Sequence, residues 1–468
     1  MTSPLSTLPP MTTTPATAAP TSIDRLRLPR WLLPTDWPVR DGAPALAHLT
    51  LAAGRIAALR PALRADDGAE APVGPAGASD ATGNLPPPGP SAAEGRLAWD
   101  AAGALALPGL VDAHTHLDKS FTFGRMAHVE PGLLGAIDAM LADRAHWTPA
   151  DVRERAERGL RWAWESGTTR LRSHVDWWEA DAVPVAWGVL RELAEAWRGR
   201  VRLERVALVK LPLFEDRAQA LRLARTIAAT GPDALLGGFV HSTNWSENAL
   251  RNLLLAAQAC DLDVDLHVDE ELEASATGLA ATARLLGEIG FEGRVVCGHA
   301  CALAAQPESL ALATLDAVAR APITLVSLPA TNLLLQDATT GRTPRRRGLT
   351  LVKEARERGI PLLFASDNVQ DPFCRSGSFD PVEALGLAAL VAQLDAPFDG
   401  WSDTVCRAGW LDRGRPGAAS IVGAPADLVL FTQADRHGWP SRAGARVVLR
   451  DGAVTQGEVP TAWRAPMR

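Results

Sequence analysis

Short apolar runs alternate with longer segments of helical period from Leu110 to about Arg407, and this alternation constrains the fold more than any other feature of the chain. The eight apolar runs lie near Val111–His116, Thr169–His174, Leu203–Val209, Leu235–Val240, Val264–His267, Val295–His299, Ile323–Ser327 and Leu362–Asp367. Repeated β-α units imply a parallel sheet, and eight of them are typical of a barrel. The sequence therefore predicts an α/β fold organised as a (β/α)8 TIM-type barrel.

Strand-like runs also occur outside the predicted barrel. Leu46–Leu59 is typical of a hairpin that turns at Gly54-Arg55. After the barrel, Ala426–Phe431 and Arg446–Val454 have strand composition, and Asp451-Gly452 is a hairpin-turn signal. We expect the strands from both ends of the chain to pair into one small β-sandwich-like domain.

The predicted organisation has four parts. Residues 1–22 form a disordered tail, and residues 23–106 form the first part of the small β domain. That part contains a flexible insertion at 61–95, which is rich in Gly, Ala, Pro and Asp. Residues 107–410 form the barrel, and residues 411–468 complete the small β domain.

Composition limits the partners of the chain. It has 468 residues, of which 47% are hydrophobic, and a net charge of −7. Only one short basic run occurs, so we expect no nucleic-acid partner. No apolar stretch of about 18 residues occurs, so we expect no membrane partner. The N-terminus lacks the features of a signal peptide, and five cysteines without a C-x-x-C pair favour a reducing compartment. We expect a cytoplasmic homo-oligomer.

Polar side chains mark the ends of the predicted strands. Six of the ten histidines lie there, together with one aspartate: His114, His116, His174, His241, His267, His299 and Asp367. The carboxyl ends of the strands form the active-site face of this barrel class. These side chains are therefore candidates for one site.

The His-x-His pair is the clearest metal-binding signal. Side chains repeat every second residue along a strand, so His114 and His116 project to one side. The pair alone also fits a structural role. With His267 and Asp367 it makes an N₃O set that suits one divalent transition metal, namely Zn or Fe with Mn possible, and leaves a position open for water.

Glu270 lies three residues after His267. A divalent metal acidifies its bound water, and a neighbouring carboxylate can carry protons to the ring nitrogen and the leaving amine. The structural alternative is a helix-start carboxylate, one of several between Asp269 and Glu273.

Five segments together resemble cytosine deaminase and its relatives in the metal-dependent amidohydrolase superfamily. They are Leu-Pro-Gly-Leu-Val-Asp-Ala-His-Thr-His-Leu-Asp-Lys at 107–119, Arg-Ser-His-Val-Asp at 172–176, His-Val-Asp-Glu at 267–270, Gly-His-Ala at 298–300 and Ser-Asp-Asn-Val-Gln-Asp-Pro-Phe at 366–373. Pro-Arg-Arg-Arg-Gly-Leu-Thr-Leu-Val-Lys-Glu at 344–354 is also similar. The resemblance covers roughly residues 105–400 and implies a distorted barrel with one catalytic metal.

By position, the resemblance implies roles for individual residues. The metal ligands would be His114, His116, His267 and Asp367. Glu270 would shuttle protons, His299 would hydrogen-bond the attacking hydroxide or the tetrahedral intermediate, and Asp367 would also accept a proton from the water. Lys119, Asn368 and Phe373 would contact substrate. Leu213 stands where the family has a substrate-reading Gln, which weakens the case for cytosine itself.

Other residues carry open alternatives. His174 and His241 orient ligands from behind or are ordinary buried histidines. Trp245, with Trp177 and Trp178, walls a heterocycle pocket or caps the barrel. Lys210 could be a carbamylated lysine that bridges two metals. The basic run Arg345–Arg347, with Arg342, binds an anionic substrate or forms a solvated loop or a subunit contact.

We predict a hydrolase that acts on carbon–nitrogen bonds other than peptide bonds. Its substrate would be a small amino-substituted N-heterocycle, such as a cytosine-like pyrimidine or an amino-triazine, and it would release ammonia or an amine. The alternatives are an amidohydrolase that opens a cyclic amide and a non-catalytic scaffold of the same fold.

Overall fold

The computed structural model describes residues 19–63, 97–414, 417 and 419–464. The chain forms two compact units. One contains residues 1–106, 420–433 and 444–468, and the other contains residues 107–419 and 434–443. Most of the predicted tail and insertion lies outside the described residues. Of their described ends, Ser22 begins a strand and Pro61 ends one.

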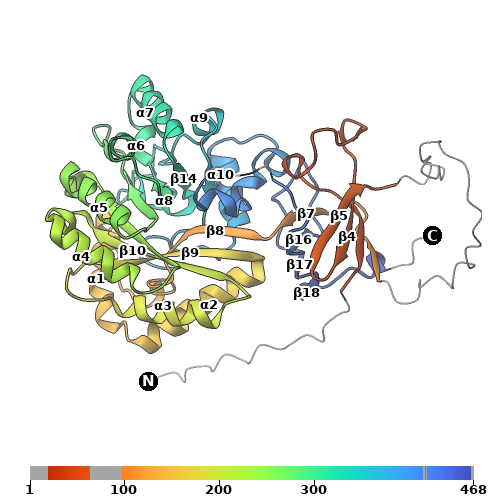
Figure 1. Cartoon of the computed structure of the whole chain (residues 1–468), viewed down its shortest axis with the longest axis horizontal. Helices are drawn as coiled ribbons and strands as arrows, with labels where there is room; N and C mark the ends of the chain where they lie inside the picture. The colour runs from red at the N-terminus through yellow and green to blue at the C-terminus, as the bar shows by residue number, and fades with distance from the viewer. Residues whose placement is uncertain (1–18, 64–96, 415–416, 418, 465–468) are drawn as a thin grey trace, which may run out of the picture. The chain divides into compact units, whose positions relative to one another are not determined.

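The larger unit contains one sheet of eight parallel strands (Figure 1). In order of adjacency they are β8 (Leu110–Thr115), β9 (Thr168–Trp177), β10 (Arg202–Lys210), β11 (Ala234–Val240), β12 (Val264–Val268), β13 (Val295–His299), β14 (Ile323–Ser327) and β15 (Leu362–Phe364). A parallel bridge between Thr115 and Asp367 joins the two edges of the sheet. The predicted (β/α)8 barrel is confirmed.

Helices connect successive strands and lie around the ring in Figure 1. They are α1 (Leu133–Asp143), α2 (Pro149–Ser166), α3 (Val185–Ala196), α4 (Arg217–Ala228), α5 (Glu247–Ala259), α6 (Gly278–Ile289), α7 (Glu308–Arg320), α8 (Pro329–Leu335), α9 (Val352–Glu357) and α10 (Pro381–Val391). Local chemistry fixes some of their ends. Thr148 accepts a hydrogen bond from Asp151 N at the start of α2, and Gly167 ends that helix with φ +107°.

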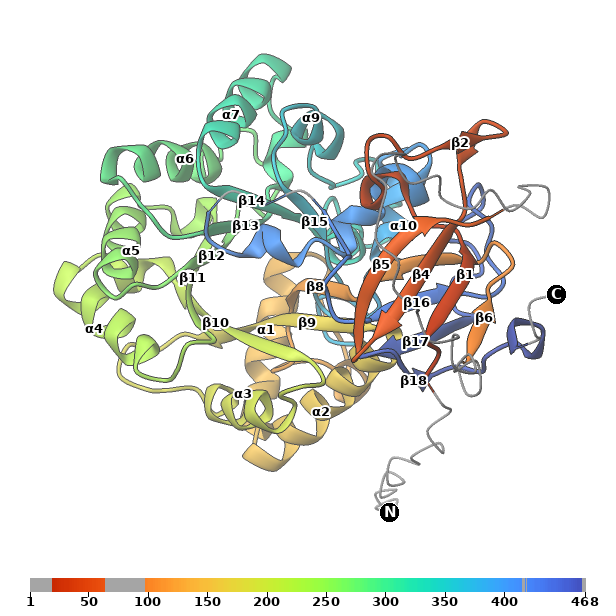
Figure 2. The ribbon, with the colours of Figure 1, turned by 45° about the vertical axis from the view of Figure 1, so that its right-hand side comes forward.

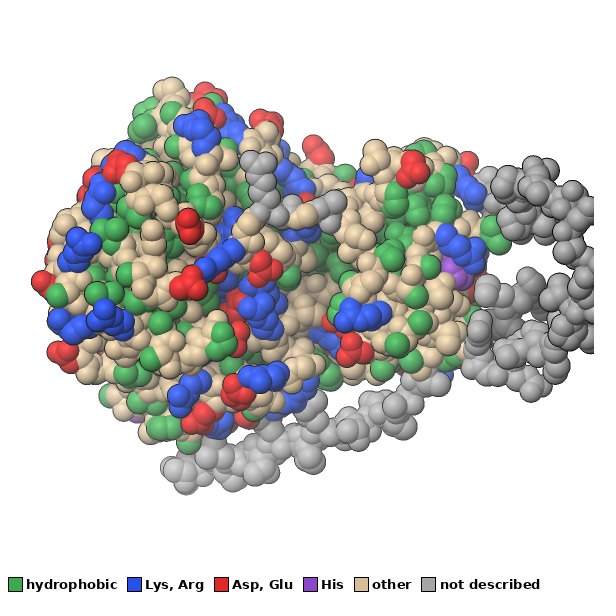
Figure 3. All heavy atoms as spheres, in the orientation of Figure 1, with side chains coloured by type: hydrophobic (Ala, Val, Ile, Leu, Met, Phe, Trp, Pro, Cys, Tyr) green, Lys and Arg blue, Asp and Glu red, His purple; other side chains and the backbone are tan. Residues whose placement is uncertain are grey.

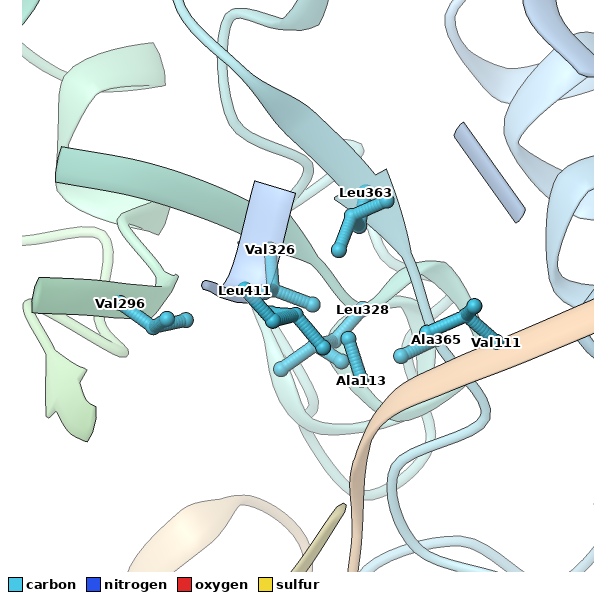
Figure 4. Packing of buried hydrophobic residues seen from close by; sticks show 8 residues of the cluster. All are labelled: Val111, Ala113, Val296, Val326, Leu328, Leu363, Ala365 and Leu411. Atoms are coloured by element: carbon cyan, nitrogen blue, oxygen red, sulfur yellow. The ribbon is translucent and has the colours of Figure 1, made fainter. Parts of the chain in front are cut away.

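Apolar side chains of four strands pack into a common cluster (Figure 4). The cluster contains Val111, Ala113, Val296, Val326, Leu328, Leu363, Ala365 and Leu411. Figure 4 shows these side chains directed toward one another. Because β8 and β13 are not neighbours in the sheet, the cluster ties together strands that share no hydrogen bonds.

The smaller unit contains two four-stranded sheets (Figure 2). One has the order β5-β4-β1-β6, with β1 (Ser22–Leu26), β4 (Ala47–Ala52), β5 (Arg55–Pro61) and β6 (Ala98–Asp100). The other has the order β18-β17-β16-β7, with β7 (Leu105–Pro108), β16 (Leu428–Phe431), β17 (Arg446–Arg450) and β18 (Ala453–Gln456). A two-stranded ribbon of β2 (Val39–Arg40) and β3 (Ala43–Pro44) completes it. Strands from both ends of the chain share the second sheet, as the sequence predicted.

Several predicted boundaries differ from the structure by one to three residues, and three of them show why. The first hairpin turns at Ala53-Gly54, where both residues have positive φ, as a tight two-residue turn requires. β9 continues three residues past His174, to Trp177. β15 ends at Phe364 rather than Asp367, and Asp367, with left-handed backbone at φ +59°, joins the sheet through an isolated bridge to Thr115.

In the described part of the chain, no helix is long and apolar enough to cross a membrane. On the face displayed in Figure 3, basic and acidic side chains are interspersed. This face carries no broad patch of one sign.

Candidate active site

Four buried side chains from β8, β12 and the stretch after β15 converge on one point. Nε2 of His267 lies 3.2 Å from Nε2 of His114 and 3.2 Å from Nε2 of His116. Oδ1 of Asp367 lies 3.6 Å from Nε2 of His114 and 3.3 Å from Nε2 of His116. The structure thus brings together the four residues that the sequence named as metal ligands.

The spacing and chemistry of this set fit a divalent metal. Bonds of about 2.0–2.1 Å from a tetrahedral ion would place neighbouring ligand atoms about 3.3–3.4 Å apart, close to the four distances observed. Burial lowers the pKa of His114, His116 and His267 well below the usual value, so the imidazoles are neutral. A shared cation would use the lone pairs that these rings and the Asp367 carboxylate direct at one another.

Glu270 and His299 lie beside the metal set. Oε1 of Glu270 is 3.3 Å from Nδ1 of His299, and Nδ2 of Asn332 is 3.1 Å from the same nitrogen. Burial raises the pKa of Glu270 well above its usual value, and Asp367 adds to the shift. Burial lowers the pKa of His299 to about 3. At neutral pH Glu270 is therefore a proton donor, and His299 is a neutral ring whose Nδ1 accepts.

The carboxylates of the acidic run after β12, between Asp269 and Glu273, make different contacts. Asp269 accepts hydrogen bonds from the backbone N–H groups of Gly278 and Leu279 at the start of α6, so it fills the helix-start role. Glu271 accepts from Ser242, and Glu273 accepts from Ser275. Among the carboxylates of this run, Glu270 alone lines the central cavity.

Two polar pairs flank the metal set. Nζ of Lys119 donates to both carboxylate oxygens of Asp176 at 2.8 Å and lies 5.0 Å from the centre of the Phe373 ring. Burial opposes the charge of Lys119, but Asp176 and other carboxylates outweigh it and raise its pKa. Nδ2 of Asn368 donates to Asp371 at 2.7 Å. Lys119, Phe373 and Asn368 line the same cavity as His116 and His267, and their role as substrate contacts stays a prediction.

These groups open onto a cavity of about 280 Å³. Its polar wall contains His116, Lys119, Asp176, His267, Glu270, His299 and Asn368. Its apolar wall is supplied mainly by α1, through Leu133, Leu134, Ile137, Met140 and Leu141. The volume lies at the small end of the range for ligand pockets, roughly 300–1,000 Å³, and the mixture of walls suits a flat, partly polar ring.

Other candidates lie away from the cavity lining. Leu213 is half-buried in the turn after β10, where its carbonyl accepts from Gln219, and its neighbour Pro212 lines the cavity instead. Trp245 does not line the cavity, whereas Trp178 does. The interpretation of Leu213 and Trp245 as wall residues is therefore not supported by their positions.

The two remaining histidines differ in position. The His174 ring packs on His114 with centroids 3.9 Å apart, and its Nε2 is 3.6 Å from Asp265 Oδ1, so it lies behind the metal set. His241 stacks on Phe239 and lies 3.4 Å from Glu271, outside that set.

The structure also shows the surroundings of Lys210 and of the basic run at 342–347. Nζ of Lys210 lies 3.9 Å from the centre of the Trp178 ring, which gives the bridging-lysine alternative no support. Arg342 pairs with Asp337, and Arg347 donates to the Val391 carbonyl, as expected of a solvated loop.

Asp176 and Asn332 were missed as site residues, whereas Trp178 had been named as a possible pocket wall. Asp176 was visible in the Arg-Ser-His-Val-Asp segment, but the strand was predicted to end too early for it to count. Asn332 lies on α8, and nothing in its local sequence distinguishes it from a helix-surface amide.

Comparisons with known proteins agree with this geometry. A sequence model described as "Amidohydrolase family" matches residues 124–456. A pterin deaminase from Rhizobium rhizogenes is 40% identical over 364 residues, which cover 77% of this chain and 83% of that protein. An N-isopropylammelide isopropyl amidohydrolase from a Pseudomonas species is 27% identical over 301 residues, which cover 61% and 68%.

Solved structures share the fold. The 5-methylcytosine deaminase from Klebsiella pneumoniae, liganded with phosphonocytosine, superposes with a TM-score of 0.69 at 24% identity over 95% of this chain and 100% of that one. The family match spans most of the chain, and the barrel contains a His/Asp cluster suited to a divalent metal. The chain belongs to the amidohydrolase family and is a hydrolase that acts on carbon–nitrogen bonds other than peptide bonds.

Proposed function

We propose that this chain hydrolytically removes the exocyclic amino group of a pterin-like N-heterocycle. The reaction converts a ring C–NH₂ and one water into a ring carbonyl and ammonia. The observation that carries the proposal is Glu270, a buried carboxyl that lines the same cavity as two of the metal-ligand candidates, His116 and His267. The 40% identity to a pterin deaminase supports the choice of ring.

The proposed metal residues are His114, His116, His267 and Asp367. When bound there, a divalent metal supplies Lewis acidity, which lowers the pKa of a water molecule towards about 7. Asp367 accepts a proton from the attacking water. Glu270 holds a proton near neutral pH because of its raised pKa, and it donates this proton to the ring nitrogen next to the attacked carbon. As the carbonyl forms, Glu270 takes the second proton of the added water and passes it to the leaving amine. The proton held by Asp367 then returns to Glu270, so both carboxyl groups end in their starting states.

His299 stabilises the oxygen that becomes the product carbonyl. Its Nδ1 accepts from Asn332, so the ring proton lies on Nε2. A neutral N–H directed into the cavity donates a hydrogen bond to the developing charge without needing to lose a proton. Asn332 is therefore a positioning residue that fixes the tautomer of His299.

Turnover with and without Glu270 tests the proposal. The metal-loaded chain is incubated with pterin, cytosine, isocytosine, creatinine and an N-alkyl ammelide, and ammonia or amine release is measured with the ring product. We expect pterin to be converted to its dioxo product with equimolar ammonia. Release from none of these substrates would overturn the proposed function, and ring opening without ammonia would favour cyclic-amide hydrolysis.

A matched pair of variants isolates the role of Glu270. Glu270→Gln should lower kcat by about 10²–10⁴-fold, the usual contribution of general acid–base catalysis. Glu273→Gln removes an exposed carboxylate from the same run and should leave kcat unchanged. Wild-type turnover by Glu270→Gln would contradict the mechanism.

The proposal has further parts. We place one Zn or Fe ion, with Mn as an alternative, in a cytoplasmic homo-oligomer. The N₃O ligand set suits Zn and Fe, and a related adenosine deaminase from Xanthomonas campestris was solved with bound zinc. We also keep residues 107–410 as the catalytic domain, with the β domain at 23–106 and 411–468. Elemental analysis of the purified chain and its mass by light scattering test the metal and the oligomer.

A further inference from the structure

Lysine is rare in this chain, and its placement is uneven. Of 47 Lys and Arg residues, only Lys119, Lys210 and Lys353 are lysines. Two of these three line the active-site cavity, and no arginine does so among the described residues. Lysine presents a compact point charge, whereas arginine presents a broad planar fork. Both cationic side chains of this small cavity are lysines although the chain is rich in arginine. We infer that the cavity needs the compact ammonium group rather than the broad guanidinium group.

The two cavity lysines have different surroundings. Lys119 is buried, and Asp176 neutralises it through two hydrogen bonds of 2.8 Å. Lys210 is half-buried, and no described carboxylate lies within ion-pair distance of its Nζ. Its ammonium group contacts the face of the Trp178 ring, 3.9 Å from the ring centre. Lys210 is therefore a positive charge held in place by an aromatic ring but not neutralised.

Lys210 stands apart from the catalytic groups in the barrel. It is the last residue of β10, which supplies none of the proposed metal ligands or proton donors. Trp178 contacts its ammonium group, Phe239 is its register partner on β11 and Pro212 follows it by two residues, and none of these three carries a charge. Its half-buried ammonium group gains more from an anion that enters the cavity than a fully exposed one would, because charges attract more strongly away from bulk water.

We propose that Lys210 binds an anionic substituent, a carboxylate, on the ring edge of the substrate away from the amino group. The inference rests on the proposed function and narrows its substrate class to carboxylated amino-heterocycles. The Trp178 face holds the ammonium in one place by a cation–π interaction, so little side-chain entropy is lost when the carboxylate arrives. The apolar wall of α1 covers the ring itself.

Matched substrates and variants test this assignment in the metal-loaded enzyme. The value of kcat/KM is measured for pterin, pterin-6-carboxylate and pterin-7-carboxylate with wild type, Lys210→Met, Lys210→Arg and Lys353→Met. In wild type we expect at least one carboxylate to exceed pterin in kcat/KM. In Lys210→Met that preference should fall by about tenfold or more, mainly through KM, because a single charge-assisted contact contributes about that much.

The controls separate charge from shape. Lys210→Arg keeps the charge and should keep most of the preference, whereas Lys353→Met removes an exposed charge on α9 and should leave the preference at its wild-type value. A wild-type enzyme that favours neutral pterin over both carboxylates would overturn the assignment. So would an equal loss for neutral and carboxylated rings in Lys210→Met.

Binding without turnover distinguishes failure of this inference from failure of the proposed function. In metal-loaded Glu270→Gln, calorimetry compares the Kd of the three rings, and mass spectrometry follows acylation of each lysine. A carboxylated ring should bind more tightly than pterin and protect Lys210 but not Lys353. If wild type turns over none of the rings while this pattern holds, the deaminase proposal fails and the anion site stands. Turnover of pterin without preferential protection of Lys210 would sink the anion site alone.

Discussion

The barrel contains two buried polar clusters that solve the problem of buried charge in opposite ways. Near the starts of β9 and β10, Glu204 lies between two arginines, 2.6 Å from Arg170 Nη2 and 2.9 Å from Arg172 Nη2. Arg172 also donates to Asp265 at 2.8 Å. At the other ends of the strands, three neutral imidazoles and the Asp367 carboxylate face one another without any arginine.

The difference separates structural from functional polar groups. In the first cluster, which we call the Glu204 network (Arg170, Arg172, Glu204 and Asp265), each acidic side chain pairs with at least one arginine. Such a network holds strands together and offers little to a ligand. In the metal set, none of the four side chains is a cation that could pair with the lone pairs. Binding of a cation from outside would therefore lower the free energy of the site. A buried polar cluster therefore indicates a functional site when its side chains do not neutralise one another.

The largest expected effect comes from the metal set. His267→Ala should lose the bound metal and lower kcat/KM by about 10³-fold or more, because a metal contributes several kcal/mol to the stability of the transition state. Chelation should lower the melting temperature of wild type, since a ligand of the native state stabilises it, but should leave His267→Ala unchanged. Metal content, turnover and melting curves measure these effects.

His128→Ala is the matched control, because His128 is exposed and pairs only with Glu130 on the surface. It should keep wild-type metal content. A metal-free His267→Ala with wild-type turnover would remove the distinction between the two clusters.

The second effect concerns the Glu204 network. Glu204→Gln should destabilise the barrel by about 3–5 kcal/mol, because two buried arginines lose their counter-charge. The melting temperature should fall by roughly 5–10 °C. Glu192→Gln breaks a partly exposed pair with Arg153 and should cost less than about 1 kcal/mol. Similar losses in the two variants would mean that the network contributes no more than a surface pair.

The third effect lies at the junction of the clusters. His174 touches His114 on one side and approaches Asp265 on the other. His174→Phe keeps a ring but removes both nitrogens, and it should weaken metal affinity by about 10–100-fold, as loss of an orienting partner does. His174→Gln, smaller but polar, should recover part of that affinity. Chelator competition measures the change, and unchanged affinity in both variants would make His174 an ordinary core residue.

The barrel was predictable because its determinants are local and repeated. Each of the eight strands is a Val/Leu-rich run bounded by helical sequence, and the sheet order follows the chain order. The metal set was also predictable, because parallel strands end at one face and the histidines occupy those ends. Resemblance to a known family then supplied the roles of Glu270 and His299.

What the sequence could not show depends on backbone detail and on long side chains. His299 and Asp367 both have left-handed backbone, φ +69° and +59°, in which non-glycine residues are uncommon and strained. Strand periodicity gives no sign of such turns. The Lys119–Asp176 pair joins residues 57 positions apart, and no local pattern links them. Leu213 was named from its motif position, which does not reveal that it lies in the turn after β10 and outside the cavity lining.

The smallest expected effect is an acid dependence that belongs to the Glu204 network. Burial opposes ionisation of Glu204, but Arg172 and Arg170 outweigh it and lower its pKa to about 2. An unfolded Glu titrates at about 4.3, so the folded value is the lower one. Its contribution to stability is therefore complete above about pH 5 and is lost as the pH falls towards 2.

Between pH 5 and pH 3, wild type should lose about 1–2 kcal/mol more unfolding free energy than Glu204→Gln, which has no carboxyl to titrate. Urea unfolding of the metal-free proteins at both pH values isolates this loss from protonation of the metal ligands. Equal losses would show that the arginines do not hold Glu204 ionised. The contrast between the Glu204 network and the metal set would then rest on geometry alone.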